Sequence, residues 1–213
     1  MLRSLTCGCA ALLMASSAYA ADIEAPAPYD WNGFYLGLHA GYLWGDVDIE
    51  EEGEVAASGG DIDGFVGGAL AGFNVQFDPL VLGLEADIGW TDVDGDGVAP
   101  PPEPDYSYEL NWNAHVRARA GFAFDNALIF VAGGLAIADL DIDQYNTNQI
   151  GGDYYGWSIG GGIDYAFTDA LIGRIEYLHD EFGDKDYEED EEDYTADLDT
   201  DTVRAALIYK FMP

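Results

Sequence analysis

The sequence predicts an all-β fold: an eight-stranded antiparallel up-and-down transmembrane β-barrel with both termini in the periplasm. Short turns join runs of alternating apolar and polar residues, and they fall at residues 77–79, 124–126 and 167–169. Long acidic segments alternate with the turns and hold 31 of the 41 Asp and Glu residues; they span residues 45–63, 91–111, 139–155 and 178–202. Short turns at one end and long polar loops at the other are typical of outer-membrane barrels.

The chain begins with a predicted secretory signal peptide, residues 1–20. Arg3 supplies a positive charge, an apolar stretch follows, and small residues before Ala21 provide a cleavage pattern. We therefore expect cleavage between Ala20 and Ala21. The apolar stretch is too short to span a bilayer, so it is not expected to remain as an anchor.

Residues 21–30 are expected to form an extended periplasmic leader, and residues 31–213 the barrel. Both cysteines, Cys7 and Cys9, lie in the predicted signal peptide, so the mature chain is expected to have no disulfide and no thiolate metal site. A lipoprotein would be acylated at one of them, but neither has the usual lead-in sequence.

Composition argues against other classes of protein. The 213 residues carry a formal net charge of −34 and include only 7 Lys and Arg. Nucleic-acid binding needs clustered cations for phosphate contacts, so no nucleic-acid partner is expected. No apolar run reaches the ~18 residues that suggest a transmembrane helix. The sequence also suggests no cofactor, apart from the calcium discussed below.

Eight runs between the turns and the acidic segments are predicted to be strands. Most are near the ~9–11 residues that a tilted strand needs to cross a bilayer. An even number returns the chain to its starting side, as a closed antiparallel barrel requires. The runs are residues 31–44, 64–77, 80–91, 112–124, 127–138, 155–167, 170–178 and 202–211.

One face of each run is apolar, and the other mixes glycine with charged residues. Because successive side chains of a strand point to opposite faces, this pattern separates a lipid-facing wall from a polar lumen. The lumen charges nearly balance, which favours a filled interior in which ion pairs neutralise one another. The predicted lumen network consists of Glu85, Asp87, His115, Arg117, Arg119, Asp164, Arg174, Glu176 and Arg204, with Lys210 nearby.

Aromatic residues at the strand ends predict two interfacial bands, as in membrane barrels. With a periplasmic N-terminus, the outer band is Trp44, Trp90, Trp112 and Trp157. The inner band is Trp31, Phe77, Phe124, Phe167, Tyr209 and Phe211. The alternative is a soluble β-sandwich in which these aromatics belong to an ordinary core.

Several segments resemble the outer-membrane β-barrel family. They are WNGFYLGLHAGY (31–42), LGLEAD (82–87), VRARAGF (116–122), FVAGGL (130–135), GGIDYAFTD (161–169), RIEY (174–177) and VRAALIYKF (203–211). The family includes the small "porin family" surface antigens of Gram-negative bacteria, and it is similar to the OmpA transmembrane domain and the opacity proteins.

The resemblance implies residence in the outer membrane of a Gram-negative bacterium, in contact with outer-membrane lipid and lipopolysaccharide. It also implies insertion by the barrel-assembly machinery, which is thought to read the final aromatic of Tyr-Lys-Phe. This chain departs from that ending because Met212-Pro213 follow Phe211.

The sharpest local motif is a calcium-loop spacing. Asp92, Asp94 and Asp96 alternate before Gly97, and Glu103 follows at the distal ligand position. Predicted strands replace the flanking helices of an EF-hand, and three prolines precede Glu103. The alternative interpretation is a solvated acidic loop. A denser acidic run at 184–194 is predicted to be a solvated loop tip, or else a collector of divalent cations.

A structural or surface-interaction role, in envelope integrity and the display of acidic extracellular loops, is the function that these patterns favour. Eight strands leave an interior just wide enough for side chains, so an open pore is not expected. A narrow cation-selective pore is the first alternative, since the rim is acidic. A lipid-modifying enzyme is a weaker one, because none of His39, His115 and His179 has a nearby serine in the sequence.

Overall fold

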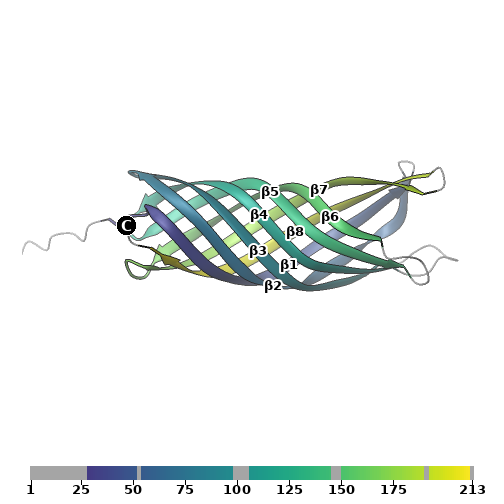
Figure 1. Cartoon of the computed structure of the whole chain (residues 1–213), viewed down its shortest axis with the longest axis horizontal. Coiled ribbons are helices and arrows are strands. Elements are labelled where there is room, and N and C mark those ends of the chain that lie inside the picture. Colours follow the sequence, from purple (N-terminus) through teal and green to yellow (C-terminus); the bar gives the residue numbers. More distant parts are fainter. Residues whose placement is uncertain (1–27, 52–53, 98–105, 145–149, 190–191, 212–213) are drawn as a thin grey trace, which may run out of the picture.

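A computed structural model of the chain describes residues 28–51, 54–97, 106–144, 150–189 and 192–211. Eight antiparallel strands pair in sequence order, and the first pairs with the last to close a barrel (Figure 1). The strands are β1 (Gly33–Glu51), β2 (Glu54–Phe77), β3 (Leu80–Gly97), β4 (Tyr106–Phe124), β5 (Ala127–Gln144), β6 (Ile150–Ala166), β7 (Leu171–Glu189) and β8 (Glu192–Lys210). The predicted closed barrel of eight antiparallel strands is confirmed. No described segment is a helix long and apolar enough to cross a membrane.

The two ends of the barrel differ. At the turn end, the predicted tight turns join β2 to β3, β4 to β5 and β6 to β7. The first described residues and the end of β8 also lie there, since the Lys210 ammonium bonds the carbonyl of Asp30 (Figure 1). At the opposite end, the loop end, β1 leads to β2, β3 to β4, β5 to β6 and β7 to β8.

The predicted long acidic loops are wrong in extent, because most of each acidic segment is strand. β7 and β8, for example, continue to Glu189 and from Glu192, so they cross almost all of the predicted loop 178–202. Acidic residues have low strand propensity. The closed barrel nearer the turn end already holds neighbouring backbones in register, however. The backbone hydrogen bonds between strands therefore continue through the acidic sequence toward the loop end.

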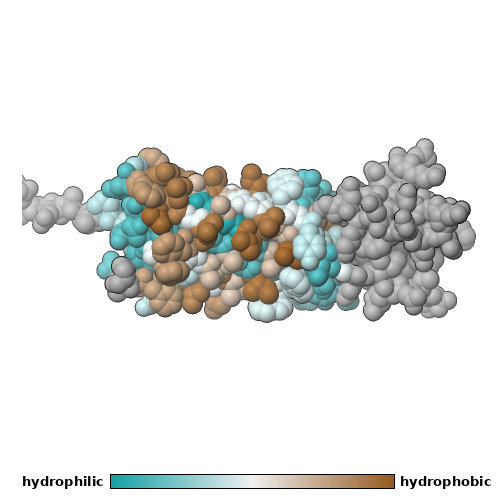
Figure 2. All heavy atoms as spheres, turned by 45° about the horizontal axis from the view of Figure 1, so that its top comes forward, coloured by the Kyte–Doolittle hydropathy of each residue, from teal (hydrophilic) through white to brown (hydrophobic). Residues whose placement is uncertain are grey.

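The outer wall is apolar over a band that matches a bilayer. Along β3, the outward residues from Leu80 to Trp90 are apolar and exposed, over about the 9–11 residues that a tilted spanning strand needs. Figure 2 shows this hydrophobic belt with more hydrophilic surface on either side. Register shifts after Trp90 in β3 and Leu110 in β4 mark the point where these strands leave the belt.

The predicted aromatic bands are present on the outer wall, with one exception. Trp90 and Phe77 are 61% and 62% exposed and point outward at the two edges of the belt. Trp31, in contrast, is only 1% exposed and packs inside the barrel mouth. Its placement in the inner band is therefore wrong, because Trp31 precedes the start of β1 at Gly33 and turns into the lumen.

Inward glycines allow so few strands to close a barrel. At Gly134 of β5, a Cβ atom would lie 2.1 Å from the backbone oxygen of Val116 on β4. At the adjacent outward Gly133, the nearest atom to a Cβ would be 3.4 Å away. The two neighbouring glycines thus differ only in which side of the wall a side chain would occupy.

Substitution Gly134→Val is expected to prevent closure of the barrel, because the side chain would overlap the β4 backbone. The measurement is gel mobility with and without boiling after refolding in detergent: the variant should lose the folded, heat-sensitive band. Gly133→Val is the matched control on the outward face and should keep it. Equal folding of the two variants would contradict the close approach.

Candidate functional site: an ion-paired lumen sealed at both ends

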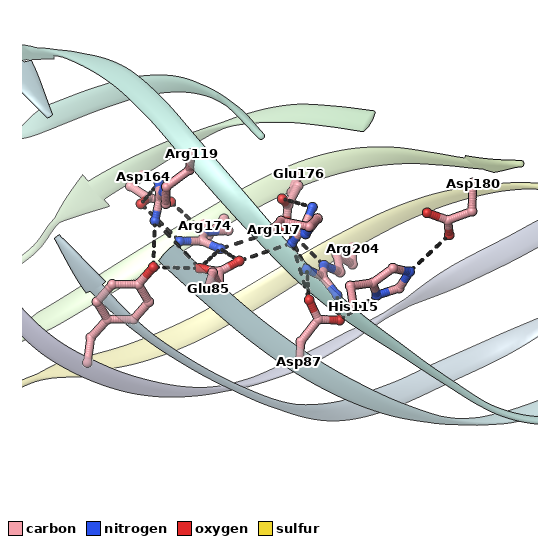
Figure 3. A network of polar contacts seen from close by, with 11 residues as sticks. Glu85, Asp87, His115, Arg117, Arg119, Asp164, Arg174, Glu176, Asp180 and Arg204 are labelled. Atoms are coloured by element: carbon pink, nitrogen blue, oxygen red, sulfur yellow. Dashed lines mark hydrogen bonds and ion pairs between the residues drawn. The ribbon is translucent and has the colours of Figure 1, made fainter. Parts of the chain in front are cut away.

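The lumen holds one continuous network of buried charges (Figure 3). Nearest the turn end, Arg174 of β7 contacts Glu85 of β3 through Nη1 and Oε2 at 2.7 Å, and Asp164 of β6 through Nε and Oδ1 at 2.7 Å. Arg119 of β4 reaches Asp164 at 2.8 Å. The Tyr35 hydroxyl donates to Glu85 at 2.8 Å and accepts from Arg119. All of these side chains are buried, and each charged one lies beside an opposite charge within the lumen.

Arg117 joins this group to a second one farther along the barrel. Its guanidinium lies 3.0 Å from a Glu85 oxygen and 2.9 Å from a Glu176 oxygen. Arg204 of β8 then contacts Asp87 at 2.8 Å and Glu176 at 2.9 Å. Two or more cations share each of four carboxylates, so the network links strands that are not neighbours across the lumen; the four are Glu85, Asp87, Asp164 and Glu176.

His115 completes the network toward the loop end. Its Nδ1 lies 2.9 Å from Asp87 and its Nε2 lies 3.2 Å from Asp180. An imidazole can donate to both carboxylates only when both ring nitrogens carry a proton. In that form His115 is the fifth cation beside four arginines, opposite the five carboxylates of Glu85, Asp87, Asp164, Glu176 and Asp180. The network of these ten side chains then has no net charge.

An apolar layer, the turn-end layer, closes the lumen below the network. Within it, the Tyr29 ring packs edge-on against Trp31 with 4.7 Å between ring centroids, and the Lys210 ammonium lies 4.4 Å from the Tyr29 ring centroid. Burial, reinforced by the nearby Asp169 carboxylate, raises the pKa of Tyr29 to about 12, so its hydroxyl keeps the proton that it donates to the Asp169 carbonyl. The layer comprises Tyr29, Trp31, Tyr35, Leu70, Val81, Leu128, Ala166, Ile172, Ala206 and Ile208, with Ala123 packed against it.

A second apolar layer, the loop-end layer, closes the lumen above the network. It comprises Leu43, Ile62, Val66, Val93, Leu110, Ala136, Ala138, Tyr154, Phe182 and Leu198. Each layer takes side chains from all eight strands. The barrel interior therefore consists of an apolar layer, the charge network and a second apolar layer. An ion on the barrel axis would meet apolar side chains before it reached the charges.

The structure brings together all nine of the predicted lumen residues. It adds Asp180 and Tyr35, which sequence reasoning missed. Asp180 lies in the predicted acidic segment 178–202, although the inward alternation from Arg174 continues through Glu176 and Leu178 to Asp180 and Phe182. That continued period of two was a usable signal. Tyr35 lies in the predicted strand 31–44, and its sequence neighbours do not show that its hydroxyl contacts the charges.

The predicted calcium motif remains a prediction. The backbone from Asp92 to Gly97 belongs to β3 and pairs with β4, and Glu103 lies outside the described residues. The extra Met212-Pro213, the signal peptide with its Ala20–Ala21 cleavage site, and the tip of the 184–194 run also lie outside them, wholly or in part. Two of the three histidines, His39 and His115, are buried in the lumen, where a lipid substrate cannot reach them.

The strand register at the loop end sets acidic residues directly opposite one another. Such like-charged cross-strand pairs are destabilising when nothing compensates them. The four acidic segments contain 31 acids and a single cation, Lys185. Opposed pairs include Asp46 with Asp199, Asp48 with Asp197, Asp63 with Asp94, Asp94 with Glu109, Glu109 with Asp141, Asp139 with Asp153, and Glu181 with Asp199.

An apolar outer belt, aromatic edges and a polar, ion-paired lumen in a closed barrel define a small transmembrane β-barrel of the outer-membrane type. The sequence comparison agrees. The chain belongs to the outer membrane protein beta-barrel domain family, whose model matches residues 7–211.

Relatives of nearly the same length carry outer-membrane names. The 25 kDa outer-membrane immunogenic protein of Brucella abortus is 30% identical over 99% of both chains. The 22 kDa outer membrane protein of Rhizobium leguminosarum is 29% identical over 85% of this chain and 78% of its own. Among solved structures, the outer membrane protein OprG of Pseudomonas aeruginosa superposes with a TM-score of 0.55 at 12% identity, over 85% of this chain and 98% of its own, which supports the fold alone. The protein is an outer-membrane barrel of a Gram-negative bacterium.

Proposed function

We propose that the protein is a structural and surface-display barrel of the outer membrane, neither a pore nor an enzyme. The sealed lumen is the observation that carries this proposal, because it leaves the barrel wall as an anchor and the loop end as the distinctive surface. The turn end faces the periplasm and the loop end faces the outside, since short periplasmic turns are the rule for such barrels.

The acidic loop end supports a role at the cell surface. Its charge keeps the extended strands soluble beyond the membrane belt and limits unspecific association. The Brucella relatives are named immunogenic, which fits exposure of this part of the fold. Outer-membrane lipid and lipopolysaccharide would contact the belt, and the barrel-assembly machinery would insert the chain.

A labelling experiment tests the orientation. If the signal peptide is removed, the mature chain has no cysteine, so single cysteines can be placed at Asp153 of the loop end and at Asp169 of the turn end, both of them exposed. A membrane-impermeant maleimide on intact cells should label Asp153→Cys and should label Asp169→Cys only after lysis. The reverse pattern would invert the barrel, and labelling of the wild type would show that the signal peptide is retained.

A deletion strain tests the role. Loss of the gene should increase leakage of periplasmic proteins and sensitivity to detergent. A chain that lacks residues 184–194 should restore the barrier and lose only the surface property that those acids confer. A deletion strain with an intact barrier and altered lipid A would instead favour a lipid-modifying enzyme.

A narrow cation-selective pore is the second candidate. The acidic loop end favours it, because carboxylates at a rim concentrate cations and select against anions. The two apolar layers oppose it. Conduction would require both layers and the network to move aside.

A further inference from the structure

A histidine and carboxylates meet on the outer wall near the loop end, away from the lumen. His179 and Glu181 are two residues apart on β7, so both point outward. Asp201 and Asp199 of β8 lie directly opposite them. One ligating atom from each of His179, Glu181 and Asp199 falls within 4.8 Å of the others. Two adjacent strands thus present a square of four side chains, here named the β7–β8 cluster.

Neighbouring side chains already hold the histidine in place. The His179 Nδ1 lies 2.9 Å from the Asp201 Oδ1, and the Tyr177 hydroxyl donates to that same oxygen at 2.6 Å. The Trp157 ring packs edge-on against the imidazole, with 5.9 Å between ring centroids. A carboxylate that fixes one ring nitrogen leaves the other to bind a metal, which is the arrangement found behind most histidine ligands of metals.

The charge around the cluster independently favours a bound cation. Glu181 and Asp199 are cross-strand partners, and Asp46 of β1 is the partner of Asp199 on its other side. This row therefore holds three carboxylates side by side, in a region of the sequence with one cation among 31 acids. Directly opposed like charges cost stability, and a divalent cation between them would remove that cost.

We infer that the β7–β8 cluster is a binding site for a divalent first-row transition metal such as Zn²⁺, with His179, Glu181 and Asp199 as ligands and Asp201 as the group that orients His179. Imidazole with carboxylates suits this class of metal, whereas Ca²⁺ and Mg²⁺ prefer oxygen ligands alone. Ligands around one Zn²⁺ at ~2.0–2.2 Å would lie roughly 3.5 Å apart, so the exposed carboxylates need to close by about 1 Å. The remaining coordination position faces outward and would take water or an external ligand.

Calorimetric titration of the refolded, detergent-solubilised barrel with ZnCl₂ tests the site. The wild type should show one saturable site per chain. His179→Gln, which retains a hydrogen-bonding group toward Asp201, should weaken Zn²⁺ binding at least tenfold, and Glu181→Gln should weaken it to a similar degree. Glu109→Gln removes an equal charge from an exposed position on β4 and should leave Zn²⁺ affinity unchanged. Each variant is first checked for its folded band on an unboiled gel.

A second measurement locates the metal. Bound Cu²⁺ quenches nearby tryptophan fluorescence, so the Cu²⁺-quenched fraction should fall in Trp157→Phe and persist in Trp90→Phe, which changes an exposed tryptophan on β3. The inference is overturned if wild-type binding is weak and does not saturate, or if His179→Gln and Glu109→Gln bind Zn²⁺ alike. Either result would mean that the acidic wall attracts cations only as a diffuse counterion layer.

Discussion

Replacing Arg174 by methionine is expected to lower the free energy of unfolding by about 3–5 kcal/mol, the usual effect of breaking a buried ion pair from one side. Arg174 bridges Glu85 and Asp164 at 2.7 Å each, and its guanidinium also lies 4.8 Å from the centroid of the Phe130 ring. Removal would leave two carboxylates in the lumen with one fewer cation. Urea unfolding of the barrel in lipid vesicles, followed by tryptophan fluorescence, gives the measurement.

Two further variants make this prediction specific. Ile175→Met changes the neighbouring outward residue, 68% exposed on the wall, and should alter stability by less than about 1.5 kcal/mol, as apolar exchanges of similar volume do. Adding Asp164→Asn to Arg174→Met should recover part of the loss, because one uncompensated carboxylate disappears. If Arg174→Met were no worse than Ile175→Met, the network would not be what stabilises the lumen.

Replacing Trp31 by alanine is expected to cost about 3–5 kcal/mol, as truncation of a buried large aromatic usually does. Trp31 fills the barrel mouth and contacts the wall also through its backbone nitrogen, which donates to the Gln76 side chain at 2.7 Å. The same urea titration measures the loss. The residues just before β1 are therefore expected to be an integral part of the fold.

Trp31→Phe is the conservative control and should retain most of the stability, since a smaller ring still fills part of the layer. Tryptophan accessibility gives a second readout. In the folded barrel, acrylamide should quench Trp31 less than the four outward tryptophans. In an unfolded chain it should quench all five alike. A Trp31→Ala barrel as stable as the wild type would mean that the residue is only a leader or an interfacial anchor.

The strand faces and the lumen charges could be predicted because both follow from local periodicity. Arg117 and Arg119 alternate with apolar neighbours, and an eight-stranded barrel has only one place for such charges. The ends of the strands at the loop end could not be predicted in the same way. Beyond Trp44 and Trp90 the outward residues become acidic, so the apolar-outward signal stops although the backbone ladder continues. Past these limits only inward apolar residues, such as Val93 and Phe182, continue the period of two.

Other features depend on which strands meet across space. Tryptophan is a residue type typical of membrane interfaces, and only the path of the chain before Gly33 turns Trp31 into the barrel. The partnership of His115 with Asp180 joins β4 to β7, and that of His179 with Asp201 depends on the β7–β8 register. A strand pattern fixes the face of each residue. It does not fix the height at which two distant strands align.

Planar-bilayer recording of the purified, folded wild-type protein tests the sealed lumen most directly. Two apolar layers with a neutral ion-pair network between them predict no steady conductance above the bare bilayer over a range of voltages. Steady cation-selective steps that vanish when lumen charges are reversed, for example in Glu85→Lys, would contradict the account and establish a pore.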